Sequence, residues 1–239
     1  MVVKGIRSIN PRAHHLNVEH CNNMTFENLY LNTLVRNSDT DGINTRNSSF
    51  IKIFNSVIAT GGDCISLDDG STDFSISNIT CGPARFSFIY VPVHIKLHFS
   101  IYNIGSLGKY LDPAWWLPVR DIHVKKILFR DTFSGIHIMT YPKPIENQVH
   151  DVYFEDIVMD NVRNPIVIDQ EYNTENATTS SRVKISNIHI RNVRGTSNTP
   201  TVVNLKCSKT FPCEGLYFFN IDLKYNGRGP DQTRSPLRA

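Results

Sequence analysis

The 239-residue chain lacks the features that mark several specialised protein classes. Its 25 Lys and Arg residues against 22 Asp and Glu give a net charge of +3 with no basic stripe, which argues against a dedicated nucleic-acid binder. No convincing amphipathic helix of three turns is present, which argues against an α-helical fold. The five cysteines form no CxxC pairs, so neither a zinc site nor a dithiol redox motif is indicated.

Long hydrophobic runs are also scarce. The most apolar window, residues 86–104, carries His94, Lys96 and His98 near its middle, and such groups are costly at the centre of a bilayer. We therefore expect no transmembrane helix there and no membrane partner. The residues after Met1 lack the apolar region of a signal peptide, so the chain is either cytosolic or the later part of a longer secreted precursor. We favour the precursor.

A repeated phrase is the main positive signal in the sequence. Apolar residues surround an Asn or Asp, as in Phe26-Glu27-Asn28-Leu29 and Phe154-Glu155-Asp156-Ile157. Taking the third residue as marker gives positions 28, 55, 78, 126, 156, 187 and 220, which stand 23 to 33 residues apart except for one interval of 48. Apolar and polar residues alternate around each marker, which is the period of a β-strand.

Short strands at this spacing predict an all-β fold, a parallel β-helix, in which each coil buries its apolar face by stacking on its neighbours. The recurring Asn or Asp fits a bend where its amide hydrogen-bonds to the equivalent side chain one coil away. An antiparallel β-sandwich is the alternative. It needs a hairpin turn about every 8–12 residues, and such turns are scarce in this sequence. We expect a single domain over residues 1–227 and a frayed polar tail at 228–239.

Two acidic residues stand one period apart. Asp41 and Asp63 are separated by 22 residues, so stacked coils place them on the same face. Hydrolysis of a glycosidic bond needs two carboxyl groups, about 6.5–9.5 Å apart in enzymes that invert the anomeric carbon. Adjacent coils can supply such a pair. On spacing alone, acids that simply occupy turns after strands explain the pattern equally well.

The cysteines and sequons indicate an oxidising, extracellular setting. Cys64 and Cys81 bracket a strand–turn–strand stretch and Cys207 and Cys213 bracket a short loop, so both pairs suit local disulfides and leave Cys21 odd. Four Asn-x-Ser/Thr sequons, which are glycan acceptors in a secreted glycoprotein, begin at Asn23, Asn47, Asn78 and Asn176.

Segments that run in unbroken order from about residue 13 to residue 227 carry a family resemblance. They are Asp39-Thr40-Asp41-Gly42-Ile43, Gly61-Gly62-Asp63-Cys64-Ile65, Cys81-Gly82-Pro83, residues 104–110, residues 164–172 and residues 207–215. Together they resemble the polygalacturonases of glycoside hydrolase family 28, especially the plant enzymes.

The resemblance implies a right-handed parallel β-helix that is secreted to the cell wall. It implies inverting hydrolysis of α-1,4-galacturonosyl bonds in pectin, an acidic polysaccharide, without a metal or other cofactor. We expect a monomer with no nucleic-acid partner. Family members are considerably longer, so we expect this chain to be a central and C-terminal portion.

The resemblance also assigns roles to individual residues. Asp41 matches the acid of the family's Asn-Thr-Asp motif, and Asp63 matches the second acid of its Asp-Asp motif, which makes them the water-activating carboxylates. The first acid of that motif, the proton donor, falls on Gly62. Lys109 at the rim of the cleft and Tyr172 match substrate-binding positions.

Other family motifs are altered in this chain. Residues 84–103 replace the Gly-His-Gly motif and carry neither the repeat phrase nor turn chemistry, so we expect the solenoid to be disrupted there. His137-Ile138-Met139 stands where the family has Arg-Ile-Lys, the clamp for the substrate carboxylate. His137 can supply part of that charge below about pH 6. Asp68 and Asp69 are weak candidates for a replacement donor, because we expect them on another turn.

Without the donor, the histidine and the cationic clamp, we expect a polygalacturonase-type enzyme of impaired activity. General acid catalysis alone contributes about 10²–10⁴-fold to the rate. The alternative is a catalytically silent pectin-binding β-helix. Release of reducing sugar from polygalacturonate separates these two hypotheses.

Overall fold

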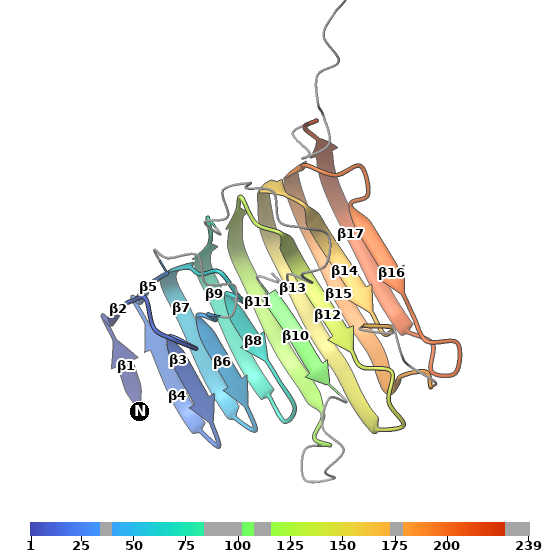
Figure 1. Cartoon of the computed structure of the whole chain (residues 1–239), viewed down its shortest axis with the longest axis horizontal. Helices are drawn as coiled ribbons and strands as arrows, with labels where there is room; N and C mark the ends of the chain where they lie inside the picture. Colours follow the sequence, from blue (N-terminus) through green and yellow to red (C-terminus); the bar gives the residue numbers. More distant parts are fainter. Residues whose placement is uncertain (34–39, 84–101, 108–115, 173–178, 228–239) are drawn as a thin grey trace, which may run out of the picture.

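The computed structural model describes residues 1–33, 40–83, 102–107, 116–172 and 179–227. Regular structure in these ranges is entirely β-strand, and the strands stack in parallel into two long sheets (Figure 1). The chain thus forms a right-handed parallel β-helix, as predicted. Within the same ranges, no helix has the length and apolar character of a membrane span.

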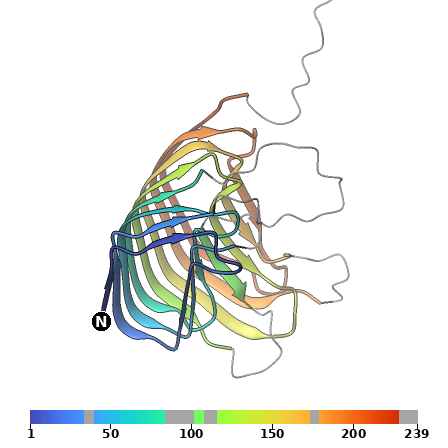
Figure 2. The same cartoon turned by 60° about the vertical axis from the view of Figure 1, so that its left-hand side comes forward.

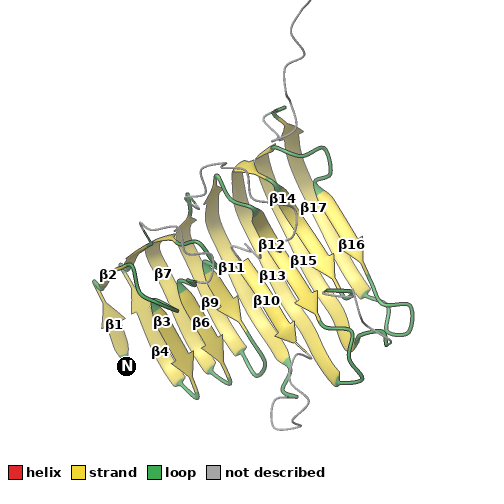
Figure 3. Ribbon diagram, in the orientation of Figure 1, coloured by secondary structure: helices red, strands yellow, loops and turns green. Residues whose placement is uncertain are grey.

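Each coil of the solenoid contributes to both sheets. Sheet A has ten strands, and sheet B has seven. Sheet A contains β1 (Val2–Lys4), β4 (Asn22–Glu27), β7 (Ser49–Ala59), β9 (Thr72–Cys81), β11 (Val119–Arg130), β13 (Glu146–Val162), β15 (Arg182–Ser197) and β17 (Glu214–Tyr225), in that order, with β2 (Arg7–Ile9) and β5 (Tyr30–Asn32) beside them. Sheet B contains β3 (Leu16–Glu19), β6 (Ile43–Arg46), β8 (Ile65–Leu67), β10 (Tyr102–Leu107), β12 (Ser134–Thr140), β14 (Asn164–Asp169) and β16 (Val203–Lys206). Figure 3 shows the strands joined by short loops along both sheets.

The space between the sheets is filled by apolar side chains. Alternation along each strand turns every second residue inward. Burying one such side chain stabilises the fold by about 1.5–3 kcal/mol, so the stacked interior holds neighbouring coils in register. The largest fully buried side chains include Phe74, Phe129, Phe154, Ile43, Ile51, Ile65 and Ile76.

Two rows of left-handed residues bend the strands of sheet A. The first row is Asn23, Phe50, Asp73, Asp121, Asp151, Asn187 and Gly215, and the second is Asn28, Asn55, Asn78, Lys126, Asp156, Asn192 and Asn220, all with φ between 53° and 59°. Asn and Asp tolerate this conformation better than most other residues that carry a side chain. The bends divide the long strands into short arms, and the sheet curls, as Figure 2 shows.

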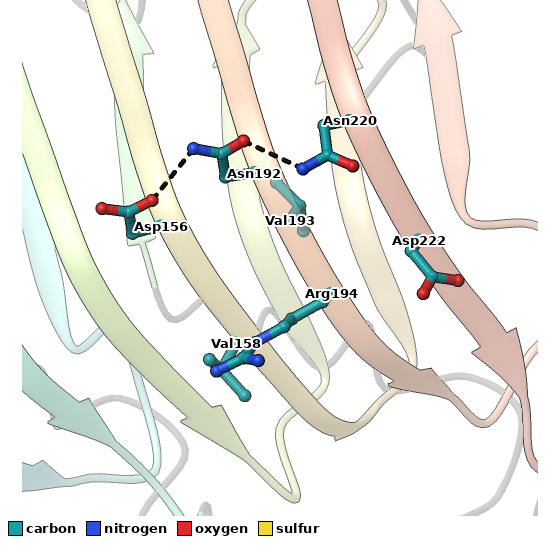
Figure 4. A pocket seen from close by; sticks show the side chains of 7 residues that line it. All are labelled: Asp156, Val158, Asn192, Val193, Arg194, Asn220 and Asp222. Carbon is teal, nitrogen blue, oxygen red and sulfur yellow. Dashed lines mark hydrogen bonds between the residues drawn. The ribbon is translucent and has the colours of Figure 1, made fainter.

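The second row is the repeat that the sequence revealed, with one correction. Sheet pairing aligns Asn192, not Asn187, with Asp156 and Asn220. Asn187 belongs to the first row, beside Asp151. The predicted amide bonding between coils is confirmed, because Asn192 donates to Asp156 Oδ1 at 3.0 Å and accepts from Asn220 at 3.0 Å (Figure 4). The marker at 187 was wrong because both rows carry Asn or Asp.

Both predicted local disulfides are present. Cys64 bonds to Cys81 and Cys207 bonds to Cys213, while Cys21 is free. The first bond joins the residue before β8 to the end of β9. It therefore ties the two strands together next to Asp63.

Most of the segment predicted to disrupt the solenoid, residues 84–101, lies outside the described residues, as does the predicted tail at 228–239. The last two residues of the segment 84–103 do not interrupt the fold. Tyr102 and Asn103 belong to β10 and pair with Ile65 and Ser66 of β8. Regular strand pairing therefore resumes at Tyr102. This is two residues before Ile104, the residue at which we expected the regular pattern to resume.

Candidate active site

Asp41 and Asp63 lie on adjacent coils, each two residues before a strand of sheet B. Gly42 N donates to Asp63 O at 2.7 Å, and Gly62 N donates to Thr40 O at 2.8 Å, so the two segments stack directly. The structure thus brings together the two acids that the one-period spacing pointed to. Their catalytic assignment remains a prediction.

The carboxylate of Asp41 faces two partners. Its Oδ1 accepts a hydrogen bond from the backbone N–H of Asp63 at 2.7 Å. Its Oδ2 lies 3.1 Å from Nδ1 of His14, which comes from the segment between β2 and β3. This second contact is an ion-pair contact that buries Nδ1.

Gly62 has no side chain, and the carboxylate of Asp41 occupies the space that one would take. A Cβ at position 62 would lie 2.3 Å from Asp41 Oδ1 and 2.9 Å from the backbone oxygen of Thr40. Both separations are too short for real contacts, so no side chain fits at position 62 unless Asp41 and its surroundings move. The Asp41 carboxylate therefore occupies the space of a side chain at position 62, where the resemblance predicts the donor.

His14 and His15 are adjacent in sequence but differ in environment. The contact with Asp41 raises the pKa of His14 against the opposing effect of burial, and the charges of Asp68 and Glu19 add to the rise. Burial lowers the pKa of His15 to about 4. His14 is therefore the protonatable member of the pair, and His15 stays neutral.

His15 has a structural role. Its Nδ1 lies 2.9 Å from Ser8 Oγ and its Nε2 lies 3.0 Å from Thr33 Oγ1. One ring nitrogen thus contacts β2 and the other contacts the residue after β5.

The rings of His137 and Tyr172 lie close together, and their substrate-binding role remains a prediction. The Tyr172 ring lies edge-on to His137, with centroids 6.3 Å apart, and edge-on to Tyr141 at 5.3 Å. Burial raises the pKa of Tyr172, and Tyr141 and the charges of Asp63 and Asp169 add to that rise. Tyr172 therefore lies close enough to Asp63 for the charge of that carboxylate to raise the tyrosine pKa.

His137 belongs to a polar row along sheet B. The register places it in line with Asn103, Ser66 and Asn44 of successive coils. Its side chain is only 9% exposed. Lys109, the other predicted substrate-binding residue, lies outside the described residues.

The two acids considered as replacement donors are engaged elsewhere. Asp68 accepts from Arg46 at 3.0 Å, and Asp69 accepts from Asn147 at 2.7 Å. Both follow β8 whereas Asp63 precedes it, so they lie on another turn, as expected. Burial raises the pKa of both carboxyls, to about 7 for Asp69.

Met139, which stands where the resemblance predicts a clamp lysine, is 7% exposed. On the next two coils the register aligns it with Asp169 and then Lys206. Lys206 Nζ lies 3.5 Å from Asp169 Oδ2, so this cation already has an anionic partner. In the described part of the chain, no three His, Cys, Asp or Glu side chains are grouped to hold a metal ion.

His14 is the site residue that sequence reasoning missed. It stands 27 residues before Asp41, the same separation as between the markers Asn28 and Asn55. The stacking rule that paired Asp41 with Asp63 could therefore have found it.

Comparison with known proteins places the chain in a family. Residues 1–86 and 99–236 match the glycosyl hydrolases family 28, and the gap in the match falls within the segment predicted to be foreign to the repeat. The chain is 37% identical over 235 residues to an exopolygalacturonase of Oenothera organensis, covering 97% of this chain and 60% of that protein. It is 37% identical over 232 residues to a polygalacturonase of Nicotiana tabacum, covering 95% and 54%. The chain thus spans little more than half the length of these relatives.

Solved structures share the fold. An endo-xylogalacturonan hydrolase from Aspergillus tubingensis superposes with a TM-score of 0.79 at 22% identity, over 95% of this chain and 60% of that structure. A polygalacturonase from Erwinia carotovora gives a TM-score of 0.61 at 21% identity, over 94% and 55%. Because the family match covers most of the sequence, and plant relatives exceed 30% identity across it, the chain belongs to the glycosyl hydrolases family 28.

Proposed function

We propose that the chain is a polygalacturonase-type hydrolase of pectin that cleaves α-1,4-galacturonosyl bonds with inversion. The observation that carries this proposal is the stacking of Asp41 on Asp63, with 2.7 Å between Asp41 Oδ1 and the Asp63 amide, in a chain of this family. In this proposal Asp63 is the base that activates water.

The proposed setting is the plant cell wall. Plant proteins are among the relatives, and two disulfides suit an oxidising compartment. We propose a secreted monomeric glycoprotein whose partner is the acidic polysaccharide itself. Asn23 and Asn78 are exposed sequon residues on sheet A.

Reduced activity follows from the altered motifs. Gly62 has no proton to give, and an acid donor contributes about 10²–10⁴-fold to such a rate. Met139 offers no charge to the substrate carboxylate, and Lys206 is already paired with Asp169. His137 and Tyr172 are then the described residues proposed to contact the sugar. We expect rates well below those of family members with the complete motifs.

A silent pectin-binding β-helix is the second candidate. The observation in its favour is that Asp41 occupies the space of a side chain at position 62. Reducing-end release from polygalacturonate tests the first proposal, with Asp63→Asn as the matched variant. Hydrolysis that disappears in the variant supports an enzyme. Binding by calorimetry with no hydrolysis supports the silent reading, and absence of both contradicts each of them.

A further inference from the structure

We propose, building on the hydrolase function proposed above, that His14 is the general acid of this site and replaces the missing donor. In this arrangement Asp41 holds the imidazolium and Asp63 activates water. The ring has two nitrogens, and Nδ1 faces Asp41. Nε2 is therefore the atom that protonates the leaving glycosidic oxygen.

The geometry of His14 suits proton transfer outward from Asp41. Nδ1 is fully buried and lies 3.1 Å from Asp41 Oδ2, whereas the His14 side chain as a whole is 33% exposed. The exposed part of the side chain therefore lies away from Nδ1. Asp41 is itself fixed through Oδ1 by the Asp63 amide at 2.7 Å, so the ring contacts a carboxylate that is held in place.

The spacing of the three residues supports the division of roles. His15 N donates to Asp41 O at 2.8 Å and Gly42 N donates to Asp63 O at 2.7 Å, so His14, Asp41 and Asp63 occupy three successive rungs. Parallel strands lie about 4.8 Å apart, which puts the backbones of His14 and Asp63 roughly 9.6 Å apart. In inverting glycosidases the acid and base groups themselves stand about 6.5–9.5 Å apart, which leaves room for the attacking water. Two rungs allow the side chains of His14 and Asp63 to take such a separation.

The charges around His14 favour its protonated form. Asp41, Asp68 and Glu19 all raise its pKa. Arg46 faces the latter two, with nitrogen–oxygen distances of 3.0 Å to Asp68 and 4.0 Å to Glu19, and offsets part of their charge. Asp41 is then the dominant partner, and its carboxylate favours the imidazolium form of His14.

The proposed step conserves atoms and charge. The Nε2–H bond of His14 breaks and its proton passes to the glycosidic oxygen as the bond from that oxygen to C1 breaks. The oxygen of a water molecule forms the new bond to C1 from the opposite face, and one water proton passes to Asp63. Two shorter chains result. Asp63 then releases its proton to solvent, and His14 takes one up.

His14→Asn tests this role by comparing two substrates. The Asn amide can still donate to Asp41 but has no proton to transfer. On polygalacturonate, whose leaving group is a sugar alkoxide, we expect kcat/KM to fall by about 100-fold or more. On 4-nitrophenyl α-galacturonide, whose leaving group departs without protonation, we expect a fall of less than about tenfold. The alkaline limb of the polygalacturonate pH–rate profile should also disappear.

His150→Asn is the matched control. His150 Nδ1 lies 2.6 Å from Asp151 Oδ2 on β13 of sheet A, a similar His–Asp pair away from the site, and its loss should change neither rate. Equal rates of His14→Asn and wild type on both substrates would overturn the acid role and leave the hydrolase function intact. An equal loss on both substrates would show a positioning role and also overturn it.

Two further outcomes are decisive. A wild-type chain that hydrolyses neither substrate removes the proposed function and the acid role together. Should His14→Asn fail to fold, as judged by its melting temperature, NMR titration of the His14 ring in the wild type is the second measurement. A midpoint at or below that of free histidine contradicts the proposal.

Discussion

The Asp63 backbone amide donates to Asp41 Oδ1 across 2.7 Å, and that same oxygen would lie 2.3 Å from a Cβ placed at position 62. The contact between the two candidate catalytic residues therefore exists because Gly62 has no side chain. The carboxylate of Asp41 therefore lies where a side chain at position 62 would begin.

Restoring the donor with Gly62→Asp should not restore activity. We expect it to lower the free energy of unfolding by about 1–3 kcal/mol, as overpacking does, because the new Cβ meets Asp41 and the Thr40 backbone. Urea denaturation measures the loss. Gly62→Ala is the matched control and should be destabilised similarly, and a Gly62→Ala variant as stable as wild type contradicts the steric account.

Asp41→Asn should lower the pKa of His14. The carboxylate beside Nδ1 favours the imidazolium, and the neutral amide removes that charge. NMR titration of the His14 ring checks the shift. A His14 midpoint that stays in place would show that Asp41 does not control its protonation.

The buried carboxyl of Asp69 predicts that stability falls as pH rises. Its pKa is raised to about 7 by burial and by the charge of Asp68, so the native state holds a proton that the unfolded state releases near pH 4. The stabilisation is complete below about pH 4 and is lost as pH rises to about 7 and beyond. Asp69→Asn should flatten this decline, because an amide oxygen still accepts from Asn147 and does not ionise. Unfolding free energies of wild type and Asp69→Asn, measured at about pH 4.5, 6 and 8, test this prediction. A parallel decline in both proteins would contradict it.

Removing the Cys64–Cys81 disulfide should cost about 3 kcal/mol, because it closes a loop with a sequence separation of 17. The Cys207–Cys213 bond, with a separation of 6, should contribute less, about 2 kcal/mol. Double Cys→Ser variants compared by thermal and urea unfolding give both values. Cys21→Ser is the control, since Cys21 is free. An order reversed between the two disulfides would show that the length of the closed loop does not determine their contributions.

The features that the sequence predicted correctly are those that depend on separation along the chain. Stacking of Asp41 on Asp63 follows from one period of the repeat, and the pairing of Cys64 with Cys81 follows from the short strand–turn–strand stretch between them. The contact of His14 with Asp41 also obeys that period, but it depends on how a side chain turns in a bend outside any strand. Two adjacent histidines carry no sequence signal that separates the protonatable one from the neutral one.

Two errors also have physical causes. Asn187 was assigned to the wrong row because Asn and Asp occupy left-handed bends in both rows, and the identity of the residue does not say which bend it makes. The return of regular structure at Tyr102 was missed because motif matching began at Ile104. Backbone pairing in a sheet needs no particular side chain, so it can resume before a motif does.

The second row of left-handed bends in sheet A contains one residue that is neither Asn nor Asp. Lys126 adopts φ 56° but carries no amide, whereas Asn78 donates to Asn55 at 2.7 Å on one side and Asn192 and Asn220 continue the chain of amides from Asp156 on the other. Lys126 has no side-chain amide, so the chain of amides is interrupted between Asn78 and Asp156. Cooperative support between the two halves of the solenoid has to pass through the apolar interior and the backbone at that point.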